Sequence, residues 1–110
     1  MVHIVWEFLV RADRLSEFQR YYSDVDGPWA QLFRKSPGFQ GTVLIRDTED
    51  PRHFLTIDSW DTVDAQVAMR EQFQREYGDL DRACEELTES ERRVGAFENW
   101  PFPGFETRTS

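Results

Sequence analysis

Residues 53–60 read HFLTIDSW, and the fold follows from how the two faces of this stretch differ. Its β-branched and aromatic side chains favour a strand, in which successive side chains point to opposite faces. One face then carries Phe54, Thr56, Asp58 and Trp60, and the other carries His53, Leu55, Ile57 and Ser59. Both faces hold large apolar groups, so both should be at least partly covered. The Asp58 carboxylate on the aromatic face consequently needs a partner or water.

The composition predicts one folded, cytoplasmic domain and argues against two kinds of partner. A chain of 110 residues with 15 % aromatics can build a core. A net charge of -8 and a pI near 4.7 argue against binding to nucleic acid or to an anionic membrane. No apolar stretch approaches the roughly 20 residues of a membrane span, and the first residues lack the pattern of a secretory signal. The single cysteine, Cys84, forms no internal disulfide and suits a reducing compartment.

Alternating apolar residues predict three further strands, over residues 2–11, 39–47 and 92–98. The turn-forming residues 48–52 join the second strand to HFLTIDSW in a hairpin, and residues 88–91 form a turn before the last strand. The sequence thus contains four candidate strands.

Apolar residues at steps of three or four predict helices between these strands. One helix covers residues 13–24, and a short second helix begins at Pro28. A long third helix is capped by Asp61 and carries a continuous apolar stripe. Gly78 interrupts this helix, so a bend and two abutting helices fit the pattern equally.

The order of elements predicts a ferredoxin-like split βαβ fold of the α+β class, with a four-stranded antiparallel sheet and helices on one face. The face without helices would still carry four large aliphatic residues, Val5, Leu9, Leu55 and Ile57. Because an uncovered apolar face is an association site, we expect a homodimer in which two sheets pack face to face. The domain spans residues 1–98. The aromatic, proline-containing tail at 99–110 should lie against this domain or across the partner, where it could close a pocket.

Six segments, taken in order, carry a resemblance to a known family. They are VWEFLVR (5–11), SEFQRYY (16–22), GPWAQLFRKSPGFQGTVLIRD (27–47), FLTIDSWDT (54–62), FQREY (73–77) and LTESERRVGAFE (87–98). In their order and spacing they resemble the antibiotic biosynthesis monooxygenase domains of the dimeric α+β barrel superfamily. The resemblance covers nearly all of residues 2–98, and it implies that two ferredoxin-like domains pair as a dimeric α+β barrel.

The resemblance also implies an activity and a site. Family members that oxidise polycyclic phenols work without metal, haem or flavin, and the deprotonated substrate itself gives an electron to dioxygen. Their pocket for a small aromatic ligand lies between the sheet and the helices. Trp60 matches the tryptophan that ends the family's third strand and often lines this pocket. Five residues from the helices would face the same space: Trp29, Phe33, Tyr22, Phe73 and Tyr77.

A second branch of the superfamily degrades haem, and this chain matches it poorly. That branch has a haem-ligating histidine on the helix about ten residues after the tryptophan, where this chain has Arg70 and its neighbours Met69 and Glu71. It also has an asparagine in the first strand, near the position of Glu7. We therefore expect neither haem nor, since no clustered ligand set is visible, a metal site.

The candidate catalytic residues are Trp60, Asp58, Tyr22 and Tyr77, and the candidate substrate-binding residues are Trp29, Phe33, Phe54, Phe73 and Arg70. Each has a structural alternative. Trp60 is a pocket residue or a packed core tryptophan. Asp58 is a general base, or it forms an ion pair with Arg46 or Arg70. The two tyrosines orient a phenol or belong to the core with their hydroxyls at its rim. The histidine of the opening stretch, His53, is expected at a dimer interface or a solvent edge.

Two functions are compatible with these observations. The first is a cofactor-independent monooxygenase acting on a small phenolic or quinone-like compound. The second is a non-catalytic protein of the same fold that binds or senses a small molecule. It fits because no residue of the sequence has a position that only catalysis explains. The sequence leaves open which of these holds, what the substrate is and whether dimers assemble further.

Overall fold

The computed structural model describes residues 1–100. Their helices and strands, in chain order, are β1 (Val2–Val10), the 3-10 turn η1 (Ala12–Arg14), α1 (Leu15–Tyr22), α2 (Pro28–Phe33), β2 (Phe39–Arg46), β3 (His53–Trp60), α3 (Val63–Gln72), α4 (Gln74–Cys84), the 3-10 turn η2 (Glu85–Leu87) and β4 (Thr88–Glu98). The prediction for the tail falls mainly on residues 101–110, which lie outside the described residues.

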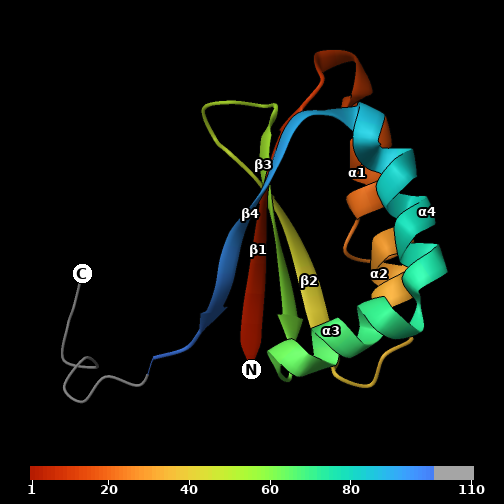
Figure 1. Cartoon of the computed structure of the whole chain (residues 1–110). Coiled ribbons are helices and arrows are strands. Elements are labelled where there is room, and N and C mark those ends of the chain that lie inside the picture. Colours follow the sequence, from red (N-terminus) through yellow and green to blue (C-terminus); the bar gives the residue numbers. More distant parts are fainter. Residues whose placement is uncertain (101–110) are drawn as a thin grey trace, which may run out of the picture.

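The four strands form one antiparallel sheet in the order β2-β3-β1-β4, with the helices on one side of it (Figure 1). This confirms the predicted α+β, ferredoxin-like arrangement. The central pair, β1 and β3, brings Ile4 opposite Asp58 and Phe8 opposite Phe54. The two inner strands therefore supply the floor on which the helices pack.

The two faces of β3 differ as the alternation predicts. Side chains of Phe54, Thr56, Asp58 and Trp60 are buried, whereas those of His53, Leu55, Ile57 and Ser59 are only half-buried. The buried set faces the helices and joins a core that includes Phe8 and Phe18. The half-buried set lies on the face without helices, which we call the open face.

The last strand is longer than predicted, because β4 begins at Thr88 rather than at residue 92. The predicted turn 88–91 was wrong: β1 pairs with these residues, with Val10 opposite Thr88 and Phe8 opposite Glu91. A run of charged residues looks like a turn in the sequence, but an edge strand tolerates such residues because they reach solvent. Glu7 on β1 forms a cross-strand contact, because its carboxylate accepts a bond from Arg92 on β4.

The third predicted helix is two helices, and both its start and its break differ from the prediction. Thr62, not Asp61, caps α3, because its hydroxyl accepts a bond from the Ala65 amide (3.0 Å). The Asp61 carboxylate instead accepts a bond from Gln40. The break falls at Phe73, whose backbone leaves the helical region, whereas Gly78 lies inside α4.

Candidate functional site

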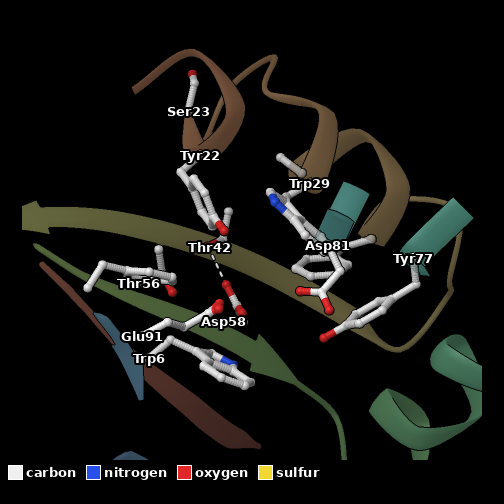
Figure 2. A pocket seen from close by; sticks show the side chains of 13 residues that line it. Trp6, Tyr22, Ser23, Trp29, Thr42, Thr56, Asp58, Tyr77, Asp81 and Glu91 are labelled. Carbon is white, nitrogen blue, oxygen red and sulfur yellow. Dashed lines mark hydrogen bonds between the residues drawn. The ribbon is translucent and has the colours of Figure 1, made fainter. Parts of the chain in front are cut away.

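A cavity of about 50 Å³ lies between the helix-covered face of the sheet and the helices, and it opens to solvent (Figure 2). Every strand and three of the helices contribute to it. The lining residues are Trp6, Phe8, Tyr22, Ser23, Trp29, Ala30, Phe33, Thr42, Thr56, Asp58, Tyr77, Asp81 and Glu91. The lining thus combines aromatic walls with a few polar groups, as small-molecule sites do.

The helix side of the cavity is an aromatic wall that depends on helical spacing. Trp29 and Phe33 are four residues apart in α2 and so share one face of that helix, with ring centroids 5.8 Å apart. Tyr22, the last residue of α1, lies 6.1 Å from Trp29, and Tyr77 of α4 meets the same indole edge-on at 5.1 Å. Three helices therefore converge on Trp29.

The sheet side of the cavity carries its most unusual group, the carboxyl of Asp58. The side chain is 9 % exposed and its Oδ1 accepts a hydrogen bond from Thr42 Oγ1 at 2.6 Å. Thr42 stands directly opposite on β2. Burial raises the pKa of Asp58 to about 6, and the bond from Thr42 only partly offsets this effect. The carboxyl can thus exchange a proton near neutral pH.

The predicted ion pair of Asp58 with Arg46 or Arg70 was wrong. Asp58 has no salt bridge to any of residues 1–100. Arg46 lies opposite Phe54, at the far end of the β2–β3 pair, and is exposed. The guanidinium of Arg70 lies over the ring of Tyr77 instead, 4.9 Å from its centroid. The carboxylate is therefore held by one neutral hydroxyl.

Two further carboxylates, Asp81 on α4 and Glu91 on β4, stand at the mouth of the cavity. Both residues are exposed, and Figure 2 shows their carboxylates directed toward the space above Asp58. Partial burial raises the pKa of Glu91, and the charges of Asp81 and Glu85 raise it further. The mouth is therefore electronegative.

The two tyrosines of the cavity stay protonated at neutral pH. Burial raises the pKa of Tyr22 far above its ordinary value of 10, and the thiol of Cys84 and the charge of Glu91 add to this effect. Burial also raises the pKa of Tyr77; the charge of Arg70 opposes this effect, and the charges of Asp81 and Glu91 add to it. Their hydroxyls can donate hydrogen bonds, but they do not act as bases.

Five of the nine predicted site residues line the cavity: Asp58, Tyr22, Tyr77, Trp29 and Phe33. The other four lie elsewhere. Trp60 is 1 % exposed and packs between Phe33 and Phe39, with centroid distances of 5.4 and 5.1 Å. Phe54 is buried against Phe18.

The remaining two predicted binding residues are near the helices but outside the lining. Phe73 is half-buried at the break between α3 and α4, with the Lys35 ammonium 5.5 Å from its ring centroid. Arg70 reaches the cavity only through Tyr77. The roles assigned to all nine residues remain predictions.

Sequence reasoning missed several residues of the cavity, above all Trp6, Thr42, Asp81 and Glu91. Trp6 could have been found, because it shares the strand parity of Phe8. Thr42 was missed because the alternation of side chains does not fix the register of the hairpin, which places Thr42 opposite Asp58. The acidic residues were interpreted as a solvated surface, and nothing in their local pattern shows that α4 and β4 bring them together.

Comparisons with known proteins agree with this geometry. The sequence model of a family described as antibiotic biosynthesis monooxygenase matches residues 1–77. The chain therefore belongs to the antibiotic biosynthesis monooxygenase family. No protein of curated function matches it.

Several solved structures share the fold at low sequence identity. SnoaB from Streptomyces nogalater, described as a cofactor-independent oxygenase, is 21 % identical over 94 % of this chain and 96 % of its own, with a TM-score of 0.75. Proteins described as putative antibiotic biosynthesis monooxygenases come from Deinococcus radiodurans (19 % identity, 91 % and 93 % covered, TM-score 0.73) and Nitrosomonas europaea (17 %, 90 % and 98 %, 0.71). At this identity the likeness establishes the fold alone.

Two features are absent from residues 1–100. Within this part of the chain, no helix is both long and apolar enough to cross a membrane. The same residues contain no group of three or more His, Cys, Asp or Glu side chains that could hold a metal ion.

Proposed function

We propose that the protein is a cofactor-independent monooxygenase that oxidises a small phenolic or quinone-forming aromatic compound, with Asp58 as the proton acceptor. The observation that carries the proposal is the Asp58 carboxyl, buried at the base of an aromatic cavity and bonded only to Thr42. A base of pKa about 6 is mostly ionised at neutral pH and takes up a proton readily.

The proposed reaction uses dioxygen as the oxidant and the substrate as the only reductant. A phenol donates its O–H proton to Asp58, and the resulting phenolate transfers one electron to dioxygen. The two radicals combine at a ring carbon to give a peroxide anion, which takes the proton back from Asp58. The resulting hydroperoxide loses water to leave a quinone. Overall, a phenol with a free ring C–H and one dioxygen give one quinone and one water, so that one oxygen atom enters the product.

The other cavity residues orient the substrate in this proposal. Tyr22 and Tyr77 donate hydrogen bonds, because their raised pKa values keep them protonated. The faces of Trp6 and Trp29 hold a flat ring. Trp60 does not touch the ligand in this proposal. It packs against Phe33 and so positions the cavity wall.

The size of the cavity limits how the substrate enters. About 50 Å³ holds water, which needs roughly 10–15 Å³, but it is smaller than the roughly 150 Å³ of a cavity known to bind benzene. A single-ring phenol therefore enters only if mouth residues move outward. Asp81 and Glu91 are exposed and Tyr77 is half-buried, so their side chains can rotate without disturbing the core.

We also propose that two copies pair through the open face, as the dimeric barrel arrangement implies. Val43, Ile45 and Phe97 of this face are 45 %, 44 % and 49 % exposed in the single chain. Together with half-buried Leu55 and Ile57 they make an apolar surface that extends across β2, β3 and β4. A dimer would bury it and leave the helix-covered cavity free.

Oxygen consumption tests the catalytic proposal. A panel of anthrones and hydroquinones should consume dioxygen and give quinones, with or without a chelator, and the rate should rise as the pH passes about 6. Asp58→Asn should lower the rate by at least about 100-fold, the usual contribution of a general base. Asp64→Asn on the exposed first turn of α3 is the matched control.

The second candidate function, ligand binding without catalysis, is favoured by the position of Trp60. The residue that corresponds to the family's pocket tryptophan packs in the core here and is absent from the lining. A ligand that raises the melting temperature while no compound of the panel consumes oxygen would support this function and contradict the monooxygenase.

A further inference from the structure

The cavity carries negative charge and no compensating positive charge. Of its thirteen lining residues, Asp58, Asp81 and Glu91 are acidic, and none is Lys, Arg or His. All three carboxylates contribute to the raised pKa of Tyr77, so they act on the same space. A ligand therefore meets the combined field of three carboxylates.

Two basic residues of the surrounding elements, Arg93 and Arg70, form no salt bridge with these carboxylates. Arg93 shares the strand face of Glu91, yet forms no ion pair with any residue among 1–100. Arg70 stacks on Tyr77, with its guanidinium 4.9 Å from the ring centroid, and among residues 1–100 it forms no ion pair with any of the three carboxylates. The carboxylates remain available to a cation from outside.

An independent observation indicates that the cavity is built to hold a ligand. Trp29 is 8 % exposed, and its indole N–H finds no acceptor among the described residues. Its neighbour Cys84 offers only sulfur, which is a weak acceptor. A buried N–H donor without a partner is costly, and a ligand oxygen would satisfy it.

Aromatic rings complete the set of groups that a cationic ligand requires. Tyr77 lies beside Asp81, Trp29 lies on the helix side of the cavity, and Trp6 lies on the sheet side (Figure 2). The negative face of such a ring attracts an ammonium group, most strongly where water is excluded. Carboxylates at the mouth and aromatic faces below them are complementary to an amine attached to a ring.

We propose that the ligand of this cavity is an aromatic compound with a ring oxygen for the deep end and a protonated amine for the mouth. Its oxygen lies near Asp58 and the Trp29 N–H, and its ammonium group lies between Asp81 and Glu91. Aromatic carboxylates are disfavoured, because they would add a fourth negative charge to a partly desolvated site. This inference rests on the proposed function, because it assumes the same site. It further specifies that the substrate carries a positive charge.

Three probes of matched shape test the proposal. Tyramine, tyrosol and 4-hydroxyphenylacetate share a phenol ring and differ in carrying an amine, an alcohol or a carboxylate. Titrated into the 15N-labelled protein at neutral pH and low salt, tyramine should bind most tightly, tyrosol next and the carboxylate most weakly. The first and last should differ by at least about tenfold, since attraction and repulsion at the mouth add. Raising the salt concentration should shrink this ratio.

The double variant Asp81→Asn, Glu91→Gln assigns the preference to the mouth. The ratio of the affinity for tyramine to the affinity for 4-hydroxyphenylacetate should fall at least about threefold, whereas the affinity for tyrosol should stay the same. Glu49→Gln, in the exposed hairpin turn outside the cavity lining, is the matched control and should leave the ratio unchanged. Both changes affect exposed residues, and the 15N spectrum of each variant reports directly that it is folded.

The outcomes separate this inference from the proposed function, because the readout is binding. Equal affinities, tighter binding of the carboxylate, an unchanged ratio in the double variant or no binding of any probe would each overturn the amine proposal. In the first three of these results a phenol still binds, so the monooxygenase proposal is left to its own test, the oxygen-consumption assay. Conversely, a preference for tyramine without oxygen uptake would uphold the ligand class and leave the protein a binder.

Discussion

The two faces of the sheet differ in whether their charged side chains are paired with opposite charges. On the open face, His53 lies between two carboxylates, with Nδ1 2.9 Å from Asp47 and Nε2 2.8 Å from Glu7, and Arg92 bonds the same Glu7. On the helix-covered face, Asp58 is more deeply buried and has only the Thr42 hydroxyl. Successive side chains on β3 alternate between these two faces.

The difference indicates what each face is for. A surface that another protein covers needs its charges paired, because an unpaired charge that loses water is costly. A cavity that stays open to small molecules can keep an unpaired carboxylate, since water or a ligand supplies its partner. This difference supports the proposed association through the open face and the proposed ligand binding on the helix-covered face. Four predictions test the properties of the two faces.

The largest expected effect is the loss of the dimer in Leu55→Asp. Leu55 is half-buried on the open face, so the single chain should fold normally with a carboxylate there. Covering that charge in a dimer would cost about 3–5 kcal/mol, which weakens association by at least about 100-fold. Sedimentation at micromolar concentration should show a folded monomer. A variant that stays dimeric would show that the open face is not the interface.

The second effect is a gain in stability in Asp58→Asn. The folded-state pKa of about 6 lies above the ordinary 3.8, so the folded protein favours the protonated carboxyl. The resulting destabilisation is absent below pH 3.8 and is fully present above pH 6. Asparagine can still accept the bond from Thr42 and carries no charge. The free energy of unfolding should rise by at most about 3 kcal/mol at pH 8.

Denaturant unfolding at pH 8 and pH 4 measures this gain. The difference between the variant and the unsubstituted protein should shrink as the pH falls toward 4. A gain that is equal at both pH values, or a loss at pH 8, would show that the Asp58 carboxylate is stabilised by a group beyond Thr42.

The third effect is a moderate loss of stability in Trp60→Phe. The smaller ring leaves space beside Phe33 and Phe39, which should cost about 1–3 kcal/mol. Because Trp60 lies behind the cavity wall, the affinity for tyrosol should fall less than in Trp29→Phe, which removes the unpaired indole N–H from the lining itself. The opposite order of affinities would place Trp60 at the ligand. Calorimetry and the same titration give both quantities.

The smallest expected effect is on the pH dependence of the free energy of unfolding, and it comes from His53. The bonds to Asp47 and Glu7 raise its pKa above 6.5, and the same bonds lower the pKa values of both carboxyls. The stabilisation from His53 is fully present below pH 6.5 and is lost as the pH rises through the raised pKa. The carboxylates contribute above their ordinary pKa values and stop contributing in acid. His53→Gln should therefore narrow the stability difference between pH 5.5 and pH 8.5. An unchanged difference would assign the pH dependence to other groups.

For the strand HFLTIDSW, the alternation of side chains predicted which residues are buried but not which groups they contact. Alternation correctly separated the buried side chains of Phe54 and Asp58 from the half-buried side chains of Leu55 and Ile57. It also predicted that Asp58 is buried and needs a partner. Alternation could not identify that partner, because the register of the hairpin, which places Thr42 opposite Asp58, is not encoded by the alternation of one strand.

The cavity was harder to predict than the sheet for a related reason. The family resemblance implied that Trp29, Phe33, Tyr77 and Phe73 face one space. The first three line the cavity, and Phe73 is not among its lining residues. The break between α3 and α4 falls at Phe73 and turns that side chain away from the lining. Local spacing shows which side chains share a face, but not where a helix ends against its neighbours.

The sequence by itself determined the order of the strands and helices, the two unlike faces of the sheet and the family, because each depends on repeats and spacings within a few residues. Only the tertiary structure decided that Asp58 is held by a hydroxyl rather than an arginine, that Trp60 packs behind the cavity, and that Asp81 and Glu91 meet at its mouth. These contacts join residues that are far apart in the chain. Their geometry follows from strand register and helix packing, which no local pattern encodes.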